Sequence, residues 1–295
     1  MNITTTGSLG NVGKPLVEAL VAMGHTVTVI SSNAAHTSAI EALGARAATG
    51  EISDTNFLKQ AFTGADAVYT MTPPAMGSEN IIDNIANAGL AYLQAIKASG
   101  VKRVVMLSSI GAHATAGTGP VQGVHRVEQL FRQLTGVNLT IIRAGIFYIN
   151  FFRDIPVIRN SNVIGNNYQG DDKLVLAHPR DVAAAIAAEL ENKGNGIEVK
   201  YIASAITTGN EVARVLGHAV GKPDLLWVSF PDEQLRQGML SAGLPPELAA
   251  LLIEMGQAVR AGTITEDFFA TGGRVTGKVT LPDFAEEFKA RYQQA

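Results

Sequence analysis

The sequence contains no cysteine, and this absence excludes several kinds of chemistry. Without cysteine the chain forms no disulfide, has no thiolate nucleophile and offers no sulfur ligand to a metal ion. No group of histidines with aspartates or glutamates shows a metal-ligand spacing either, so we expect no metal site. The 295 residues are enough for one large α/β unit, or for a main domain with a smaller appendage.

Charge and long apolar runs are also scarce. Only 17% of the residues are charged and the formal net charge is -3, which gives no electrostatic footprint for nucleic acid or an acidic membrane. No apolar run reaches the roughly 20 residues that a membrane span needs. The opening "MNITTTG" leads straight into a strand pattern and leaves no room for a signal peptide. We therefore expect a cytoplasmic monomer or homodimer that binds neither nucleic acid nor membrane.

Short β-branched runs alternate with helical patterns through the first half of the chain. The runs that read as strands are 2–6, 26–30, 66–71, 103–109 and 139–144. Repeated alternation of this kind implies right-handed crossovers, a parallel sheet and helices on both faces. The pattern predicts an α/β fold of the Rossmann type, a doubly wound parallel sheet with a 3-2-1-4-5 core.

After about residue 150 this rhythm breaks. The segment 152–171 is polar and irregular, a helix then starts near Asp181 as its expected N-cap, and 197–204 reads as another strand. The rest is mostly helical. This pattern predicts a domain of the Rossmann type over 1–151 and 172–226. A small, mostly helical lobe on the substrate side is predicted over 152–171 and 227–295, with a cleft between the two parts.

Three glycines stand three residues apart where the first strand runs into the first helix, in "TTTGSLGNVGKPLVEAL". Helix N-termini offer free N–H groups and the positive end of a dipole, which suits a pyrophosphate. Side chains at Gly7, Gly10 and Gly13 would block the turn, the approach of the phosphate or the helix–strand packing. In this βαβ context the spacing favours a dinucleotide cradle over a purely structural turn.

The end of the second strand bears on which dinucleotide is bound, because an acid there bonds the ribose 2′-OH and a basic residue accepts a 2′-phosphate. Here Ser31, Ser32 and Asn33 carry no charge of either sign. Hydroxyl and amide groups donate to a phosphate without repelling it, so NADP(H) is preferred and NAD(H) stays possible. Possible cationic neighbours of this position are Lys14, His36 and Arg46.

Further motifs follow the later strands: "TGEISD" after the third, "TMTPP" closing the fourth and "SSIGA" closing the fifth. The stretch "GVNLTIIRAGIFYIN" has the Arg-Pro-Gly-aromatic pattern ending in Asn, with Ala144 in place of the Pro. A looser match is "TGKVTLPDFAEEF" near the end. Together with the glycine loop, these motifs resemble the NmrA-like branch of the atypical short-chain dehydrogenases/reductases, which includes NADPH:quinone oxidoreductases.

The resemblance implies a set of cofactor-binding residues. Those that would hold the pyrophosphate are Gly7, Ser8, Leu9, Gly10, Asn11, Val12 and Gly13. Ser31, Ser32 and Asn33 would face the adenosine ribose. Glu51, which replaces the usual Asp, and Ile52 would flank the adenine. Thr72 and Pro73 would line the way to the nicotinamide, with Ser108 and Ser109 beside its ribose.

The catalytic pair of conventional short-chain dehydrogenases is missing. That pair is a Tyr with a Lys four residues later on one helix, where the Lys lowers the pKa of the phenol. None of the six tyrosines has such a Lys, and the expected helix, "GPVQGVHRVEQLFRQ", contains neither residue. Alcohol oxidation and sugar-nucleotide epimerisation by that mechanism are therefore disfavoured.

The same region contains other ionisable groups. His125 is the predicted catalytic replacement because histidine exchanges a proton near neutrality, and a plain surface histidine is the alternative. Glu128 reads as an ordinary helix-surface acid. His113 is expected to be solvent-exposed, and a place near the mouth of the nicotinamide site is the alternative. His178 precedes a helix and is expected to carry no chemistry.

An aromatic cluster follows the sixth strand at the carboxyl edge of the predicted sheet, where ligands bind in such folds. Its predicted substrate-binding members are Phe147, Tyr148 and Phe151. These side chains form either part of the core or a flat apolar pocket for a planar acceptor such as a quinone. Two functions remain open. One is an NAD(P)H-dependent oxidoreductase that passes hydride to such an acceptor, and the other is a non-catalytic NAD(P)-binding sensor of the NmrA type.

Overall fold

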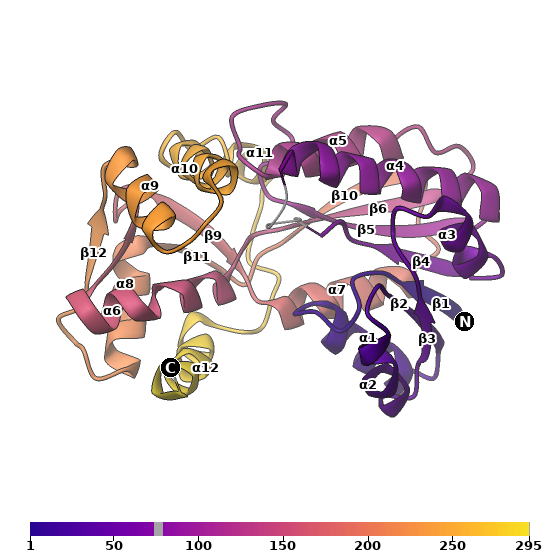
Figure 1. The fold of residues 1–295 in the computed structure, drawn as a ribbon, viewed down its shortest axis with the longest axis horizontal. Coiled ribbons are helices and arrows are strands. Elements are labelled where there is room, and N and C mark those ends of the chain that lie inside the picture. Colours follow the sequence, from indigo (N-terminus) through magenta and orange to yellow (C-terminus); the bar gives the residue numbers. More distant parts are fainter. Residues whose placement is uncertain (74–78, 295) are drawn as a thin grey trace.

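A seven-stranded parallel sheet forms the centre of the first lobe in the computed structural model, which describes residues 1–73 and 79–294 (Figure 1). The strand order is β3-β2-β1-β4-β5-β6-β10, which confirms the predicted 3-2-1-4-5 core and extends it by two strands. The strands are β1 (Asn2–Thr5), β2 (Thr26–Ser31), β3 (Arg46–Thr49), β4 (Ala67–Thr70), β5 (Arg103–Ser109), β6 (Asn138–Ala144) and β10 (Ile197–Ile202).

Helices cover both faces of this sheet, as the alternating pattern predicted. One layer contains α3 (Thr55–Phe62), α4 (Ile81–Ser99) and α5 (Val121–Phe131), and the other contains α1 (Gly13–Ala22), α2 (Thr37–Ala42) and α7 (Pro179–Glu191) (Figure 1). The central strands are nearly continuous in apolar residues because both of their faces are buried. All seven strands of this sheet run in one direction, so the loops that follow them meet at one edge of the sheet.

The second lobe is helical towards the C-terminus but also contains two small sheets that the sequence pattern did not reveal. One is β11-β9-β7 and the other is β12-β8. Its strands are β7 (Ile146–Phe147), β8 (Val163–Asn166), β9 (Lys173–Ala177), β11 (Ala205–Thr208) and β12 (Leu226–Ser229). Its helices are η2 (Tyr148–Asp154), α6 (Ile155–Ser161), α8 (Gly209–Ala219), α9 (Asp232–Ser241), α10 (Pro246–Arg260), α11 (Glu266–Ala270) and α12 (Leu281–Gln294).

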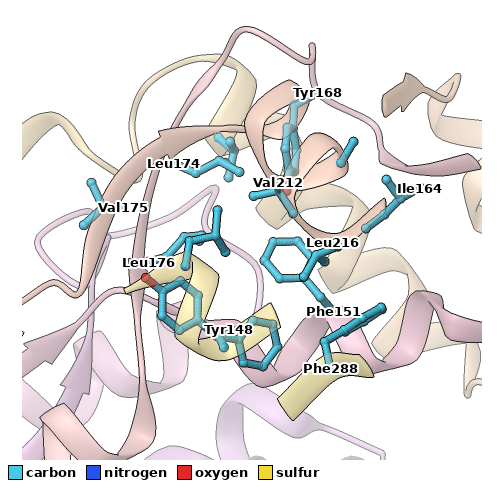
Figure 2. Packing of buried hydrophobic residues seen from close by; sticks show 14 of the residues in the cluster. Tyr148, Phe151, Ile164, Tyr168, Leu174, Val175, Leu176, Val212, Leu216 and Phe288 are labelled. Carbon is cyan, nitrogen blue, oxygen red and sulfur yellow. The ribbon is translucent and has the colours of Figure 1, made fainter. Parts of the chain in front are cut away.

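This lobe has an apolar core of its own, in which aromatic side chains from η2 and α12 meet aliphatic ones from β9 and α8 (Figure 2). β9 and α8 fall in the half of the chain predicted to bind the cofactor, yet they pack in this second core. The exact division of the chain into two domains stays a prediction.

Two helices, α7 and α4, have N-terminal caps that the sequence did not predict. His178, not Asp181, caps α7: its Nδ1 accepts from the N–H of Arg180 at 3.1 Å. The expected cap Asp181 instead accepts from the Ser204 hydroxyl at 2.6 Å, because it lies inside the first turn and faces that residue. At α4, the backbone N–H groups of Asn80 and Ile81 donate to Glu247 of α10, at 2.7 and 2.9 Å. A carboxylate of the second lobe thus caps a helix of the first.

Candidate functional site

The loop between β1 and α1 has the backbone geometry of a phosphate-binding turn. Gly7 has a φ of 88° and Ser8 a φ of 52°, so the chain reverses directly after the strand. A Cβ on Gly13 would lie 2.2 Å from the carbonyl oxygen of Ser8, whereas one on Gly10 would meet only a carbonyl oxygen at 3.3 Å. The protein's own packing requires Gly13 to be small, while the exposed space at Gly10 is open to a ligand.

The same loop has hydrogen-bond donors to spare. The backbone N–H groups of Leu9, Asn11 and Val12 donate to no acceptor among the described residues. α1 has neither a side-chain cap from a described residue nor an acidic residue in its first turn, so the helix itself places no negative charge at the positive end of its dipole. Free donors, a helix N-terminus and an open glycine together fit the pyrophosphate of a dinucleotide.

At the end of β2 the structure brings three polar side chains together. The Ser8 hydroxyl donates to Ser31 Oγ at 3.2 Å, and His36 Nδ1 lies 3.0 Å from Ser8 Oγ and 3.3 Å from Ser31 Oγ. Ser32 is exposed, and Asn33 caps the short helix η1 (Ala34–His36) by accepting from the N–H of Ala35 at 2.9 Å.

The other residues predicted on the adenine and nicotinamide sides lie at the same edge of the sheet. Glu51 is exposed and Ile52 half-buried in the turn after β3, and Thr72 and Pro73 follow β4. The last residue of the "TMTPP" motif, Pro74, lies outside the described residues. No contact tests the roles proposed for these four side chains, so those roles stay predictions.

Ser108 and Ser109, predicted beside the nicotinamide ribose, end β5. The Ser109 hydroxyl donates to the carbonyl oxygen of Ile110 at 3.0 Å. The Ser108 hydroxyl donates to Glu128 Oε1 at 2.5 Å, and Glu128 is completely buried. The prediction that Glu128 is a surface acid is wrong, because α5 turns this carboxylate toward the sheet.

Glu128 is buried together with a positive partner. Arg143 at the end of β6 donates to it twice, from Nε at 3.0 Å and from Nη2 at 2.8 Å. The remaining Nη1 of Arg143 donates to Tyr201 of β10 at 3.0 Å and to Asp267 of α11 at 2.9 Å, and Tyr201 also donates to Asp267. Burial alone would lower the pKa of Arg143, but the hydrogen bonds and the charge of Glu128 raise it above its ordinary value.

His125 lies on α5 and contacts the loop that follows β5. Its Nδ1 lies 2.8 Å from the carbonyl oxygen of Ala112, which can only accept, so Nδ1 carries the proton. Nε2 makes no hydrogen bond to any described residue. His113 differs from its predicted exposure: it is half-buried, and both of its ring nitrogens are covered and unpaired.

The three aromatic residues predicted to bind substrate lie in two different environments. Tyr148 is completely buried and stacks on Phe284 with ring centroids 5.1 Å apart, and Phe151 is only 6% exposed in the same core (Figure 2). Both side chains are therefore packed in the second lobe instead of facing a cleft. Phe147 is half-buried against the sheet of the first lobe, which leaves it as the accessible member of the three.

Two cavities lie near these groups. The larger, of about 630 Å³, borders α5, β10 and α11, and its lining includes Arg143, Tyr201 and Asp267. The smaller, of about 400 Å³, lies at the N-termini of α1 and α7 and includes Asn11 of the predicted pyrophosphate loop.

Within residues 1–73 and 79–294, no cluster of three histidine, aspartate or glutamate side chains is arranged to hold a metal ion. The helices of that same part of the chain include none with the length and apolarity to cross a membrane.

Fold and loop together define a class: a dinucleotide-binding protein of the Rossmann type, with an open glycine turn at the carboxyl edge of a parallel sheet. The chain belongs to the NAD(P)H-binding family, whose model matches residues 7–193. The match begins at Gly7, the first glycine of the cradle. The resemblance to NmrA-like atypical short-chain dehydrogenases/reductases is thereby confirmed for the fold and for the type of cofactor.

Solved structures show the same fold over nearly the whole chain. The NADPH-dependent quinone oxidoreductase QOR2 of Escherichia coli, in complex with NADPH, is 23% identical with a TM-score of 0.80, covering 97% of this chain and 99% of its own. The triphenylmethane reductase of Citrobacter sp. is 18% identical with a TM-score of 0.79, covering 99% and 100%. A nucleoside-diphosphate-sugar epimerase of Staphylococcus aureus is 16% identical with a TM-score of 0.76, covering 97% and 100%. No curated protein matches the sequence.

Sequence reasoning missed the buried network of Glu128, Arg143, Tyr201 and Asp267. A signal for Glu128 was present: it stands four residues after Val124 and three before Phe131, on the apolar stripe of α5. Asp267 and Tyr201 gave no such signal, because they come from segments far apart in the chain.

Proposed function

We propose that the protein is an NAD(P)H-dependent reductase that passes hydride to a quinone or a similar planar, electron-poor acceptor. The observation that carries the proposal is the open cradle at Gly10, in a fold whose α5 has no tyrosine or lysine to serve as an alcohol-proton shuttle. Support comes from two proteins of this fold named above, one of which is named for its action on quinones and the other for its action on triphenylmethane dyes.

A bound NADPH would supply the hydride, which carries two electrons and one hydrogen, and the acceptor takes up one proton to become a hydroquinone. The chain's own contribution is to bind and orient the two partners, since orientation supplies much of such a barrier. The developing oxyanion of a quinone is resonance-stabilised, so it does not depend on a tyrosine acid. His125 is the proposed proton donor at this edge in its imidazolium form: Nε2 is the atom that would transfer the proton, while the Nδ1–H stays on the carbonyl oxygen of Ala112.

Phe147 is proposed as the aromatic wall on which a planar acceptor stacks, since it is half-buried at the edge of the sheet. Offset stacking holds a flat ring without fixing its substituents, which suits a range of acceptors. We also propose NADPH as the preferred cofactor, a monomer or homodimer as the working unit and the cytoplasm as its location.

The proposal is tested by mixing purified protein with NADPH and a panel of quinones and triphenylmethane dyes, and following the loss of the nicotinamide absorbance band. We expect acceptor-dependent oxidation that disappears in Gly10→Val. The matched control is Gly238→Val in α9, where a Cβ meets nothing within 4 Å. Tight NADPH binding with no turnover on any acceptor would overturn the reductase and favour a non-catalytic dinucleotide sensor.

A further inference from the structure

The larger cavity is separate from the predicted cofactor and acceptor sites. It borders α5, the edge strand β10 and the segment after α11, so both lobes contribute to its wall (Figure 1). Among the described residues, its lining includes no member of the glycine cradle, and neither His125 nor Phe147. Its volume of about 630 Å³ lies within the range of about 300–1,000 Å³ that is typical of small-molecule sites.

Two arginine side chains at this cavity have hydrogen-bond donors that the chain does not use. Arg274, in the segment after α11, is exposed and forms no ion pair or hydrogen bond with any described residue. Arg132, directly after α5, has its Nη2 3.7 Å from Glu128 Oε2, which is an ion pair too long for a hydrogen bond. A guanidinium is always charged and offers its N–H groups in a planar fork that matches a carboxylate or a phosphate.

One carboxylate oxygen at the cavity is also unused. Asp267 Oδ2 accepts from both Arg143 and Tyr201, whereas Oδ1 accepts no hydrogen bond from any described residue. The Asp267 side chain borders the cavity and is 32% exposed, so a ligand can reach it. Because a carboxylate oxygen only accepts, a ligand group that bonds to Oδ1 must be a donor such as a hydroxyl.

The charged groups around the cavity leave an excess of positive charge. Three arginines border it, and the two carboxylates that contact them, Asp267 and Glu128, compensate only two of the three charges. Arg274 is the arginine without an acidic partner among the described residues. His113 borders the same cavity with both ring nitrogens unpaired, although buried polar atoms are usually paired. The wall therefore combines a positive charge with hydrogen-bonding capacity that the chain leaves unused.

We propose that this cavity binds a small hydroxylated oxyanion, a carboxylate or a phosphate whose oxygens accept from Arg132 and Arg274 and whose hydroxyl donates to Asp267 Oδ1. Such a ligand joins Arg132 of the first lobe to Arg274 of the second, so its binding stabilises the folded chain. The site is additional to the dinucleotide cradle, and the inference does not depend on the reductase activity.

The test is titration calorimetry of the full chain at constant ionic strength, with malate and glycerol 3-phosphate as the hydroxylated probes. Succinate and propyl phosphate are the matched probes that lack the hydroxyls. We expect malate or glycerol 3-phosphate to bind saturably and to raise the thermal midpoint. The matching probe without a hydroxyl should bind about tenfold more weakly, because it loses a hydrogen bond to a charged group.

Three variants place the binding. Arg274→Gln removes a side chain that holds no described partner, so it should fold normally and weaken binding about tenfold or more. Arg291→Gln in α12 is the matched control, because Arg291 is likewise exposed and has no ion pair among the described residues. Gly10→Val should bind the probe as the unmodified protein does, which separates this cavity from the pyrophosphate cradle.

Four results would overturn the inference. They are the absence of binding by both hydroxylated probes, equal affinity for probes with and without the hydroxyl, equal losses in Arg274→Gln and Arg291→Gln, and loss of binding in Gly10→Val. No dinucleotide and no turnover enter these measurements, so failure of the reductase proposal leaves the result unaffected.

Discussion

Replacing Glu128 by Gln should weaken the folded state far more than the same substitution at an exposed pair. The carboxylate is completely buried and accepts three hydrogen bonds, two of them from Arg143. Gln removes the charge and turns one acceptor into a donor that faces the guanidinium. Arg143 then keeps only Asp267 as a charged partner.

The expected cost follows from the burial of the pair. Removing one partner of a buried ion pair costs about 3–5 kcal/mol, and we expect a loss in this range because Asp267, the partner that Arg143 keeps, is itself partly exposed. A typical domain has a free energy of unfolding of about 5–15 kcal/mol, so the variant should fold but be much less stable. With a urea m-value of about 3 kcal/mol/M, the midpoint should fall by about 1–1.7 M.

The matched control is Glu18→Gln, which breaks the exposed pair with Lys14 and should change stability by less than about 1 kcal/mol. Urea unfolding is followed by far-UV circular dichroism for both variants. In a double-mutant cycle of Glu128→Leu and Arg143→Met, the double variant should be more stable than the sum of the single losses predicts, because no lone charge remains buried. Equal midpoints for the variants at Glu128 and Glu18 would refute the reasoning.

The remaining predictions concern the loop, the aromatic wall, the proton donor and one carboxyl group. Gly10→Val should abolish NADPH binding in calorimetry while leaving the thermal midpoint nearly unchanged, whereas Gly13→Ala should also lower the midpoint, because its Cβ meets a backbone oxygen at 2.2 Å; unchanged NADPH affinity in Gly10→Val would contradict the cradle. Phe147→Ala should raise the apparent KM for a quinone and lower turnover, and an unaltered KM would remove it from the acceptor wall. His125→Gln should slow turnover by about 10²–10⁴-fold if proton donation limits the rate, and steady-state kinetics showing little loss would favour water as the donor. Burial raises the pKa of Asp154 to about 7, with the charge of Arg153 acting in the opposite direction. The unfolded chain therefore loses this proton near pH 4 and the folded one only near pH 7, so stability falls as pH rises between these values. Asp154→Asn should thus be more stable than the parent at pH 8 and equal to it near pH 4 in urea unfolding, and a uniform effect at all pH values would refute this sign.

Much of the first lobe could be predicted from sequence because its signals are local. β-branched runs and amphipathic spacing mark the strands and helices of a parallel sheet, and the crossover rule then restricts their order. The glycine spacing likewise marks the cradle, since Gly10 and Gly13 face backbone atoms a few residues away and Gly7 adopts a positive φ. Gly100 shows the same local character, ending α4 in the left-handed conformation.

The second lobe gave weaker signals because its strands are short and pair at long range. β8 and β12 have four residues each, and Val163 pairs with Leu226 far along the chain. The aromatic residues after β6 were ambiguous for a related reason. Phe147 and Tyr148 are adjacent, yet one lies against the sheet and the other stacks on Phe284 of the last helix, so composition alone could not separate wall from core.

The ion pairs of Arg143, at the end of β6, affect how the chain folds while it is being synthesised. The sequence separation between Arg143 and Glu128 is 15 residues, but that between Arg143 and Asp267 is 124. At a synthesis rate of about 5–20 residues per second, the last partner leaves the ribosome roughly 6–25 s after the first pair can form. During translation, the guanidinium therefore has an early partner that neutralises it and a late one that joins the two lobes. If the chain folds from its N-terminus during synthesis, the edge of the first lobe at β6 and β10 should be completed only after α11 has left the ribosome.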